Sequence, residues 1–152
     1  MVMGEIKIET QVAVIGGGPG GYAAAFRAAD LGMDVTLIGT EERPGGVCLY
    51  RGCIPSKALL EATEWVARSR NASSWGIAFA EPEIDLDRLS EWKDEVVDRL
   101  TNGLLTLSER REIRLVQGRA VLEDSHHLRL SESEVDRVEF EHAILATGSR
   151  PI

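Results

Sequence analysis

Residues 12–21 read VAVIGGGPGG, and this stretch decides the fold class. Its first four residues are apolar and mostly β-branched, which is typical of a buried strand in a parallel sheet. A strong helix former, YAAAFRAA at 22–29, follows the glycines, and a second apolar run, VTLI, lies at 35–38. The order strand, glycine-rich turn, helix, strand predicts an α/β fold with a central parallel sheet and flanking helices.

The glycines follow the spacing G-x-G-x-x-G, with Gly16, Gly18 and Gly21 at the fixed positions and Pro19 and Gly20 between them. In this pattern the first glycine allows a tight turn, the second lets the backbone approach a pyrophosphate, and the third packs the helix against the strand. The helix start then offers N–H groups and its positive dipole end to phosphates. This context predicts a Rossmann-like dinucleotide site; the alternative is a plain glycine-rich turn.

One part of the dinucleotide pattern is missing at the end of the second strand, where an acidic residue would bind the ribose hydroxyls. Gly39 occupies that position, and Thr40 and Glu41 follow it. Either Glu41 replaces the missing carboxylate from the loop, or the ribose contact is lost and the glutamate is a solvated loop charge.

The rest of the chain alternates between helical and strand-like patterns. We expect a loop over 39–51, a helix over 54–70, a connection over 71–84 and a helix over 86–110. Apolar residues at steps of three and four make one stripe on the last helix, expected to face the core or, in part, another subunit or domain: Leu89, Trp92, Val96, Leu100, Leu104 and Leu107. Runs at 113–117, 119–123, 128–130 and 135–140 predict a small antiparallel β layer, and 142–146 a final buried strand.

Composition excludes several function classes. The chain has 152 residues, enough for one domain, and is 43% hydrophobic with a net charge of −8. Such an acidic chain argues against nucleic acid or an anionic membrane as partner. We find no membrane-length apolar run and no secretory leader, so a cytoplasmic location is expected. The only cysteines, Cys48 and Cys53, are too few for a disulfide scaffold or a zinc site of their own, and predict redox activity.

Residues 45–57, GGVCLYRGCIPSK, resemble the redox-active motif of the flavin-dependent pyridine nucleotide-disulfide oxidoreductases (class I). Within that family the CIPSK ending and the following ALL are most similar to the dihydrolipoyl dehydrogenases; mercuric and glutathione reductases are the other relatives considered. The glycine loop and ATG at 146–148 extend the resemblance over the whole chain. It implies FAD as cofactor, NAD in the full-length enzyme, a lipoyl group or other small disulfide as substrate, and a homodimer.

The chemistry of the two cysteines agrees with this resemblance. Four intervening residues allow the roughly 4.4–6.8 Å Cα separation that a disulfide needs. With Cys48 in a loop and Cys53 at a helix start, the helix N-terminus favours the Cys53 thiolate, and Lys57 adds positive charge one turn later. A flavin couples a hydride to a thiolate, so a dinucleotide loop beside a cysteine pair suggests FAD rather than NAD here.

The resemblance also assigns roles to residues. It implies that Cys48 exchanges with the substrate, that Cys53 lies against the flavin as the charge-transfer thiolate, and that Lys57 lies near the flavin's reactive nitrogen. Besides the glycine loop and residues 39–41, the implied cofactor-binding positions are Gly45, Gly46, Val47, Cys48, Cys53, Lys57, Gly118, Ala120, Ala146, Thr147 and Gly148.

Two departures from the family leave the substrate open. Tyr50 and Arg51 stand between the cysteines where the family usually has Asn and often Val. His126 and His127 match no catalytic base and are expected in a hairpin. We expect the chain to be the N-terminal segment of an FAD-binding domain, without the NAD-binding and dimerisation domains and inactive alone. A non-catalytic flavin- or nucleotide-binding module and a flavin-free thiol–disulfide protein are the alternatives.

Overall fold

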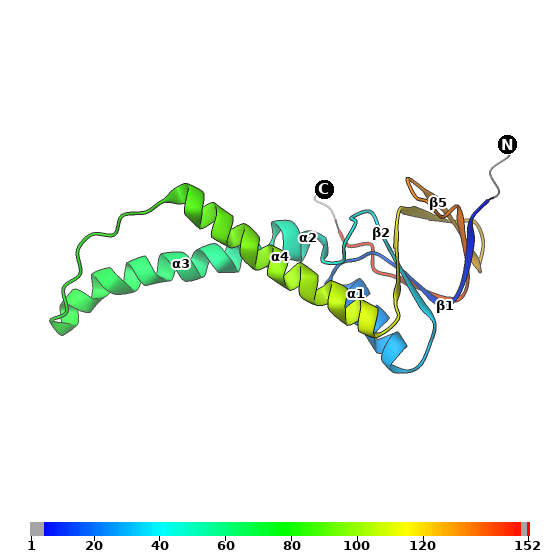
Figure 1. The fold of residues 1–152 in the computed structure, drawn as a ribbon, viewed down its shortest axis with the longest axis horizontal. Coiled ribbons are helices and arrows are strands. Elements are labelled where there is room, and N and C mark those ends of the chain that lie inside the picture. Colours follow the sequence, from blue (N-terminus) through cyan, green and yellow to red (C-terminus); the bar gives the residue numbers. More distant parts are fainter. Residues whose placement is uncertain (1–4, 150–151) are drawn as a thin grey trace. The chain divides into compact units, whose positions relative to one another are not determined.

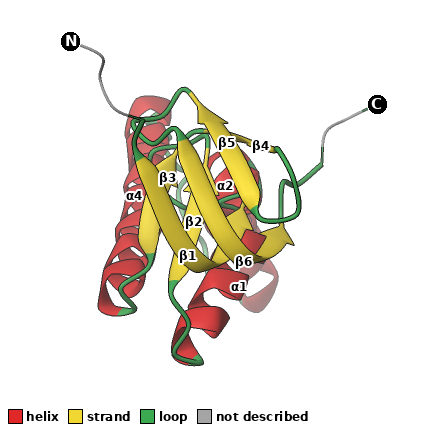
Figure 2. Cartoon of the chain, turned by 90° about the vertical axis from the view of Figure 1, so that its right-hand side faces the viewer, coloured by secondary structure: helices red, strands yellow, loops and turns green. Residues whose placement is uncertain are grey.

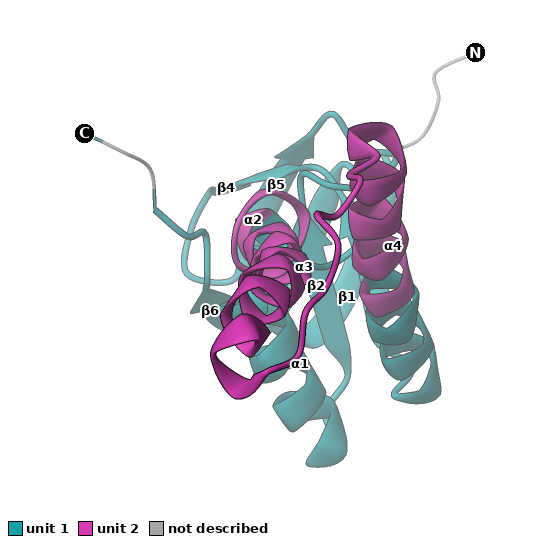
Figure 3. Ribbon diagram, turned by 90° about the vertical axis from the view of Figure 1, so that its left-hand side faces the viewer, with its two compact units in different colours: residues 1–46, 101–152 teal, residues 47–100 magenta. Residues whose placement is uncertain are grey.

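A computed structural model describes residues 5–149 and 152, and its contacts divide the chain into two compact units (Figure 3). The first unit comprises residues 1–46 and 101–152, and the second comprises residues 47–100. Each unit is described below by itself.

A six-stranded sheet forms the first unit, in the order β3-β2-β1-β6-β5-β4 (Figure 2). The strands are β1 (Lys7–Ile15), β2 (Val35–Gly39), β3 (Arg114–Gln117), β4 (Arg119–Leu122), β5 (His127–Ser131) and β6 (Arg137–Leu145). Neighbours from β3 to β6 pair in parallel, whereas β5 pairs antiparallel with both β6 and β4. The predicted α/β class, with a central parallel sheet and a smaller antiparallel part, is confirmed.

The strand predictions need three corrections. Residues 113–117 do not join the antiparallel layer, because β3 pairs in parallel with β2, Leu115 lying opposite Leu37. The runs 135–140 and 142–146 form one strand, β6, which follows β1 along its full length. The end of β6 is also not buried as predicted, since Leu145 is 65% exposed.

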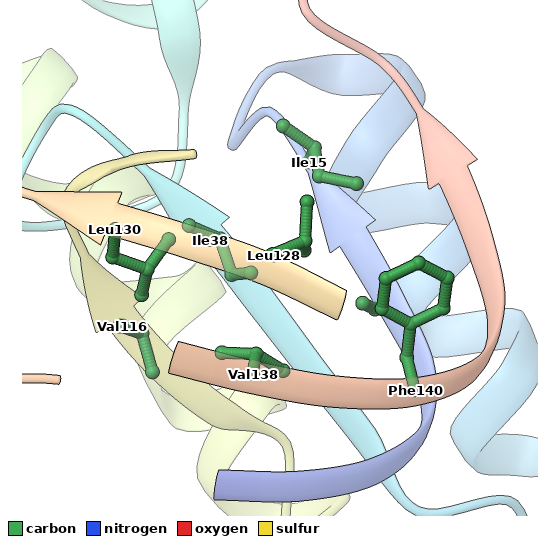
Figure 4. Close-up of a cluster of buried hydrophobic side chains, with 8 residues drawn as sticks. Ile15, Ile38, Val116, Leu128, Leu130, Val138 and Phe140 are labelled. Atoms are coloured by element: carbon green, nitrogen blue, oxygen red, sulfur yellow. The ribbon is translucent and has the colours of Figure 1, made fainter. Parts of the chain in front are cut away.

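Strand periodicity places the core on both faces of this sheet. On one face Val12 and Val14 pack with Ala25 and Ala28 of helix α1 (Pro19–Asp30). On the other face the alternate residues of β1 and β2 meet the antiparallel strands, which curl over them (Figure 4). This second cluster contains Ala13, Ile15, Ile38, Val116, Leu128, Leu130, Val138 and Phe140.

Helix α4 (Leu86–Arg110) has the predicted bounds, but its apolar stripe is only partly buried. Leu100 and Leu107 are 43% and 37% exposed, whereas Thr101 and Ser108 are fully buried. The buried face is therefore rotated by about one residue, roughly 100° of helix. A small Ser108 side chain packs closely here because its hydroxyl donates to the Leu104 carbonyl at 2.9 Å.

Beyond α4, the chain returns to the sheet beside α1. The Arg111 guanidinium donates to Asp30 at 2.8 Å and lies over the Phe26 ring, 5.0 Å from its centre. Both partners belong to α1, so this contact fixes the entry to β3 against the end of that helix.

The second unit is helical (Figure 1). It contains all but the first residue of α2 (Gly46–Arg51), then α3 (Cys53–Asn71), the 3-10 turn η1 (Ala72–Trp75) and residues 86–100 of α4. Helix α3 confirms the predicted helix over 54–70 with one more residue at each end. The predicted loop over 39–51 is wrong over 46–51, because α2 is helical and buries Leu49. Among the described residues, none of the helices combines the length and hydropathy needed to span a membrane.

Candidate functional site

The glycine loop joins β1 to α1 and leaves no room for a side chain at Gly16 or Gly21. Gly16 has φ 116° and donates its N–H to the Ile38 carbonyl at 2.7 Å. A Cβ on Gly16 would overlap the carbonyl oxygen of Ala146, and one on Gly21 would overlap the Gly16 carbonyl. The two glycines therefore allow the strand end, the helix start and the segment after β6 to meet.

A second glycine pair lies against this loop. The Gly45 N–H donates to the Gly17 carbonyl at 2.7 Å. Gly46 has φ 61°, and a Cβ there would lie 2.6 Å from the Gly18 Cα. The structure thus brings Gly45 and Gly46, expected at the site from the sequence, directly onto the glycine loop.

The end of β2 completes this edge of the sheet. A Cβ on Gly39 would lie 3.5 Å from the Gly17 nitrogen, an ordinary contact. The Gly39 carbonyl accepts the Gly118 N–H at 2.8 Å, and the Thr40 carbonyl accepts the Gln117 side-chain amide at 3.2 Å. The glycine loop, expected to bind the pyrophosphate, and Gly118, another expected cofactor-binding position, therefore both border the end of β2.

The remaining predicted positions of the first unit are near the loop or exposed. The Ala146 N–H donates to the Ile15 carbonyl at 2.8 Å, which holds this residue beside Gly16. Thr147 and Gly148 follow it and are exposed, as is Glu41, while Ala120 in β4 is half-buried. Pro44, which the sequence treats only as part of a turn, is buried next to Gly17.

The start of α1 has the electrostatic character of a phosphate site. Its N-cap, Gly18, makes no side-chain capping bond, and its first turn contains no acidic residue. The helix dipole is therefore not neutralised by a neighbouring carboxylate of the first turn.

The cysteine pair lies in the second unit, across the turn between α2 and α3. Cys48 is on α2 rather than in the predicted loop and is half-buried, while Cys53 is the first residue of α3 and is exposed. Both are free thiols. Cys48 lies close to the start of α3, because a Cβ on Gly52, the residue before Cys53, would lie 3.4 Å from the Cys48 Cα.

Two sets of influences act on the Cys48 thiol. Its pKa is raised from the ordinary value, first by the hydrogen bond to the Cys53 side chain, then by burial and by the charge of Cys53. The Cys53 N–H and the Lys57 ammonium lower the same pKa. Lys57 is thus close enough to act on Cys48 itself, whereas the sequence suggested its influence on Cys53.

The remaining sequence predictions fall on surface elements. Val47, Tyr50 and Arg51 lie on α2 with Cys48, and Val47 and Arg51 are exposed. His126 and His127 lie at the hairpin between β4 and β5, as predicted, where their N–H groups donate to the Asp124 carboxylate. No group of three or more potential metal ligands gathers among the residues that the structure describes.

Sequence reasoning missed the part played by Gly52 and Ser56, which lie at the start of the helix that carries Cys53. The Ser56 hydroxyl donates to the Gly52 carbonyl at 2.8 Å. The only sequence signal is their position, immediately before and three residues after Cys53.

A glycine cradle on a parallel sheet and a helix-borne thiol pair define the class of dinucleotide-dependent thiol–disulfide oxidoreductases. The profile of the pyridine nucleotide-disulphide oxidoreductase family matches residues 10–152, and the chain belongs to that family.

Several relatives of this chain are named dihydrolipoyl dehydrogenase. Dihydrolipoyl dehydrogenase of Buchnera aphidicola subsp. Schizaphis graminum is 44% identical over 147 residues, which cover 96% of this chain and 31% of that protein. Dihydrolipoyl dehydrogenase 2 of Haloarcula marismortui is 46% identical over 156 residues, 100% of this chain and 33% of that protein. Dihydrolipoyl dehydrogenase of Bacillus subtilis is 43% identical over 153 residues, which cover 100% of this chain and 32% of that protein. The chain therefore spans about a third of the length of these relatives.

Proposed function

We propose that this chain is the N-terminal, FAD-binding segment of a dihydrolipoyl dehydrogenase that carries the redox-active cysteine pair. The observation that carries the proposal is the turn between α2 and α3, where Cys53 begins α3 and its neighbour Gly52 lies against the backbone of Cys48. Two cysteines placed so close together, one of them at a helix start, can interconvert with a disulfide at little structural cost. The names of the relatives favour a dihydrolipoyl group as substrate over glutathione or mercuric ion.

The residues of the first unit suit FAD. The loop from Gly16 to Gly21 would hold the pyrophosphate, because its packed glycines leave backbone where side chains would block a phosphate. Gly39, Thr40 and Gly118 would border the adenosine, while Gly45 and Gly46 would support the loop from the segment that packs directly against it. Bound FAD would accept an electron pair from the cysteines and pass it on to NAD as a hydride.

The cysteines themselves would perform thiol–disulfide exchange. A substrate thiolate attacks the Cys48 sulfur of the Cys48–Cys53 disulfide, forming a mixed disulfide and releasing the Cys53 thiolate. The second substrate thiol, as it loses its proton, attacks the substrate sulfur of the mixed disulfide and releases Cys48. The released Cys48 sulfur takes up the proton that the second substrate thiol loses. The substrate ends as the cyclic disulfide, and the cysteine pair, with Cys53 still a thiolate, has gained two electrons and one proton.

Lys57 would support the thiolate forms during this exchange. Its positive charge already lowers the pKa of the Cys48 thiol, and it follows Cys53 by one helical turn. In the complete enzyme we expect NAD-binding and dimerisation domains and a homodimer; Tyr50 and Arg51, in the last turn of α2, would border the substrate.

Differential alkylation tests the redox pair. The chain is handled without reductant, labelled with one alkylating reagent, reduced, labelled with a second, and analysed by mass spectrometry. We expect both cysteines to carry mainly the second label. The Cys48→Ser variant, which retains one thiol, should take the first label at Cys53. Equal first-reagent labelling of wild type with and without prior reduction would refute the proposed disulfide.

A further inference from the structure

The first turn of α3 is held by two hydrogen bonds to one carbonyl. The Gly52 carbonyl accepts the Ser56 N–H at 3.1 Å and the Ser56 hydroxyl at 2.8 Å. Gly52 is the N-cap of α3 and has no side chain with which to cap the helix. The Ser56 hydroxyl therefore supplies a side-chain hydrogen bond at this helix start.

Gly52 also touches the helix that carries the other cysteine. A Cβ on Gly52 would lie 3.1 Å from the Val47 carbonyl oxygen and 3.4 Å from the Cys48 Cα. Because Cys53 is bonded directly to Gly52, any shift of the Gly52 peptide moves the Cys53 sulfur relative to Cys48.

We propose that Ser56 is a positioning residue that, through the Gly52 carbonyl, holds the Cys48 and Cys53 thiols at the separation from which their disulfide closes. This inference rests on the proposed redox role of the two cysteines. Gly52 contributes to the same positioning, since a Cβ there would push the Val47 carbonyl of α2 away by a few tenths of an ångström.

The physical basis is the effective concentration of one thiol at the other. Closure of the disulfide removes two electrons and two protons, which pass to the disulfide of a redox buffer such as oxidised glutathione, leaving two molecules of the reduced thiol. When the two thiols are held together beforehand, less conformational entropy is lost on closure, and the disulfide form is favoured. Without the hydroxyl, one bond still holds the Gly52 carbonyl, so the helix remains while the turn gains freedom.

The test compares three variants of the chain with wild type. Ser56→Ala removes the hydroxyl, and Ser56→Thr retains one. Ser69→Ala is the matched control, because the Ser69 hydroxyl also donates to a backbone carbonyl of α3, that of Val66, at 2.8 Å. Each protein is equilibrated in glutathione buffers of stepped potential, quenched by alkylation, and its oxidised fraction measured by mass spectrometry.

We expect Ser56→Ala to lower the equilibrium constant for disulfide closure by about three- to tenfold, where tenfold corresponds to about 30 mV towards a more oxidising potential. Ser56→Thr should restore most of the wild-type constant, and Ser69→Ala should leave it unchanged. Thermal unfolding of the reduced proteins should not separate Ser56→Ala from Ser69→Ala, so a purely structural role would not reproduce this pattern.

Two results would overturn the inference. If Ser56→Ala closes its disulfide as readily as wild type, Ser56 does not position the pair, although the redox proposal stands. If wild type forms no disulfide at any buffer potential, the proposed function itself fails. Should Ser56→Ala not fold, Gly52→Ala serves as the second variant: its Cβ would press on the Val47 carbonyl, and an unchanged closure constant there would equally refute the inference.

Discussion

Gly39→Glu should restore the carboxylate that the dinucleotide pattern lacks and tighten FAD binding. The end of β2 can accept the side chain: a Cβ at this position would meet the Gly17 nitrogen at 3.5 Å and the Glu41 carbonyl at 3.9 Å, both ordinary contacts. The Gly39 carbonyl, which accepts the Gly118 N–H at 2.8 Å, is unchanged by the substitution. The new carboxylate would leave the sheet at the edge that borders the glycine loop.

The size of the effect follows from two opposing contributions. Hydrogen bonds from ribose hydroxyls to a carboxylate are charge-assisted and stabilise by roughly 1.5–3 kcal/mol each. Ordering a glutamate side chain opposes them by about 1.5–2 kcal/mol. With two hydroxyls available, a net gain of about 1.4 kcal/mol is a moderate expectation, which corresponds to about tenfold tighter binding.

Quenching of flavin fluorescence on titration of FAD with the chain measures this change. Gly39→Gln is the matched control, because it has nearly the same size and accepts hydrogen bonds without charge; its gain should be clearly smaller than that of glutamate. If Gly39→Glu binds FAD no better than wild type, then Glu41 already supplies the ribose contact or the adenosine does not lie at the end of β2. Equal gains for Glu and Gln would refute the role of charge.

Three further changes test the described packing and electrostatics. Thr36→Val should raise the free energy of unfolding by about 1 kcal/mol in urea titrations, because the Thr36 hydroxyl is buried without a hydrogen-bond partner and valine has nearly the same shape. Gly103→Ala should also stabilise, by about 0.5–1 kcal/mol, because Gly103 lies within α4 with open space around its Cβ position; a loss would mean that this face of α4 is covered. The pKa of Asp124 is lowered because its carboxylate accepts hydrogen bonds from the N–H of His126 and from His127, so its contribution to stability is present at neutral pH and is lost as pH falls below the ordinary value of 3.8. Asp124→Asn should therefore weaken the pH dependence of the free energy of unfolding, measured with urea below about pH 4. An unchanged pH dependence would contradict the stabilising role of the Asp124 carboxylate.

The sequence predicted the elements whose patterns are long and regular. The run 12–15 has the composition of a buried strand, residues 22–29 that of a helix, and both occur as predicted because local preference and packing agree. Both ends of helix α4 agree with the prediction for the same reason, although its buried face lies about one residue away from the predicted stripe. The predicted buried face differs from the observed one because Thr101 and Ser108 are polar yet fully buried. A search for apolar periodicity does not detect buried polar residues.

The misassigned elements are those whose structure is fixed by distant partners. Helix α2 has only six residues and begins at a glycine with positive φ, so local composition favours a turn. Burial of Leu49, at 5% exposure, is what local sequence does not reveal. Similarly, the four residues of β3 carry no information on strand direction; the register against β2 decides that it is parallel.

The glycine loop illustrates how a motif accounts for only part of what its glycines do. The sequence assigns Gly16 to a tight turn, but the structure adds a second requirement: its missing Cβ makes room for the carbonyl of Ala146, which lies 130 positions later. Gly46 likewise makes room for Gly18 rather than for a turn alone. Because the cradle depends on backbone segments far apart in the chain, an alanine at Gly16 would separate the end of β6 from the loop as well as strain the turn. A local motif thus specifies where a phosphate could bind, whereas the fold determines whether that backbone stays assembled.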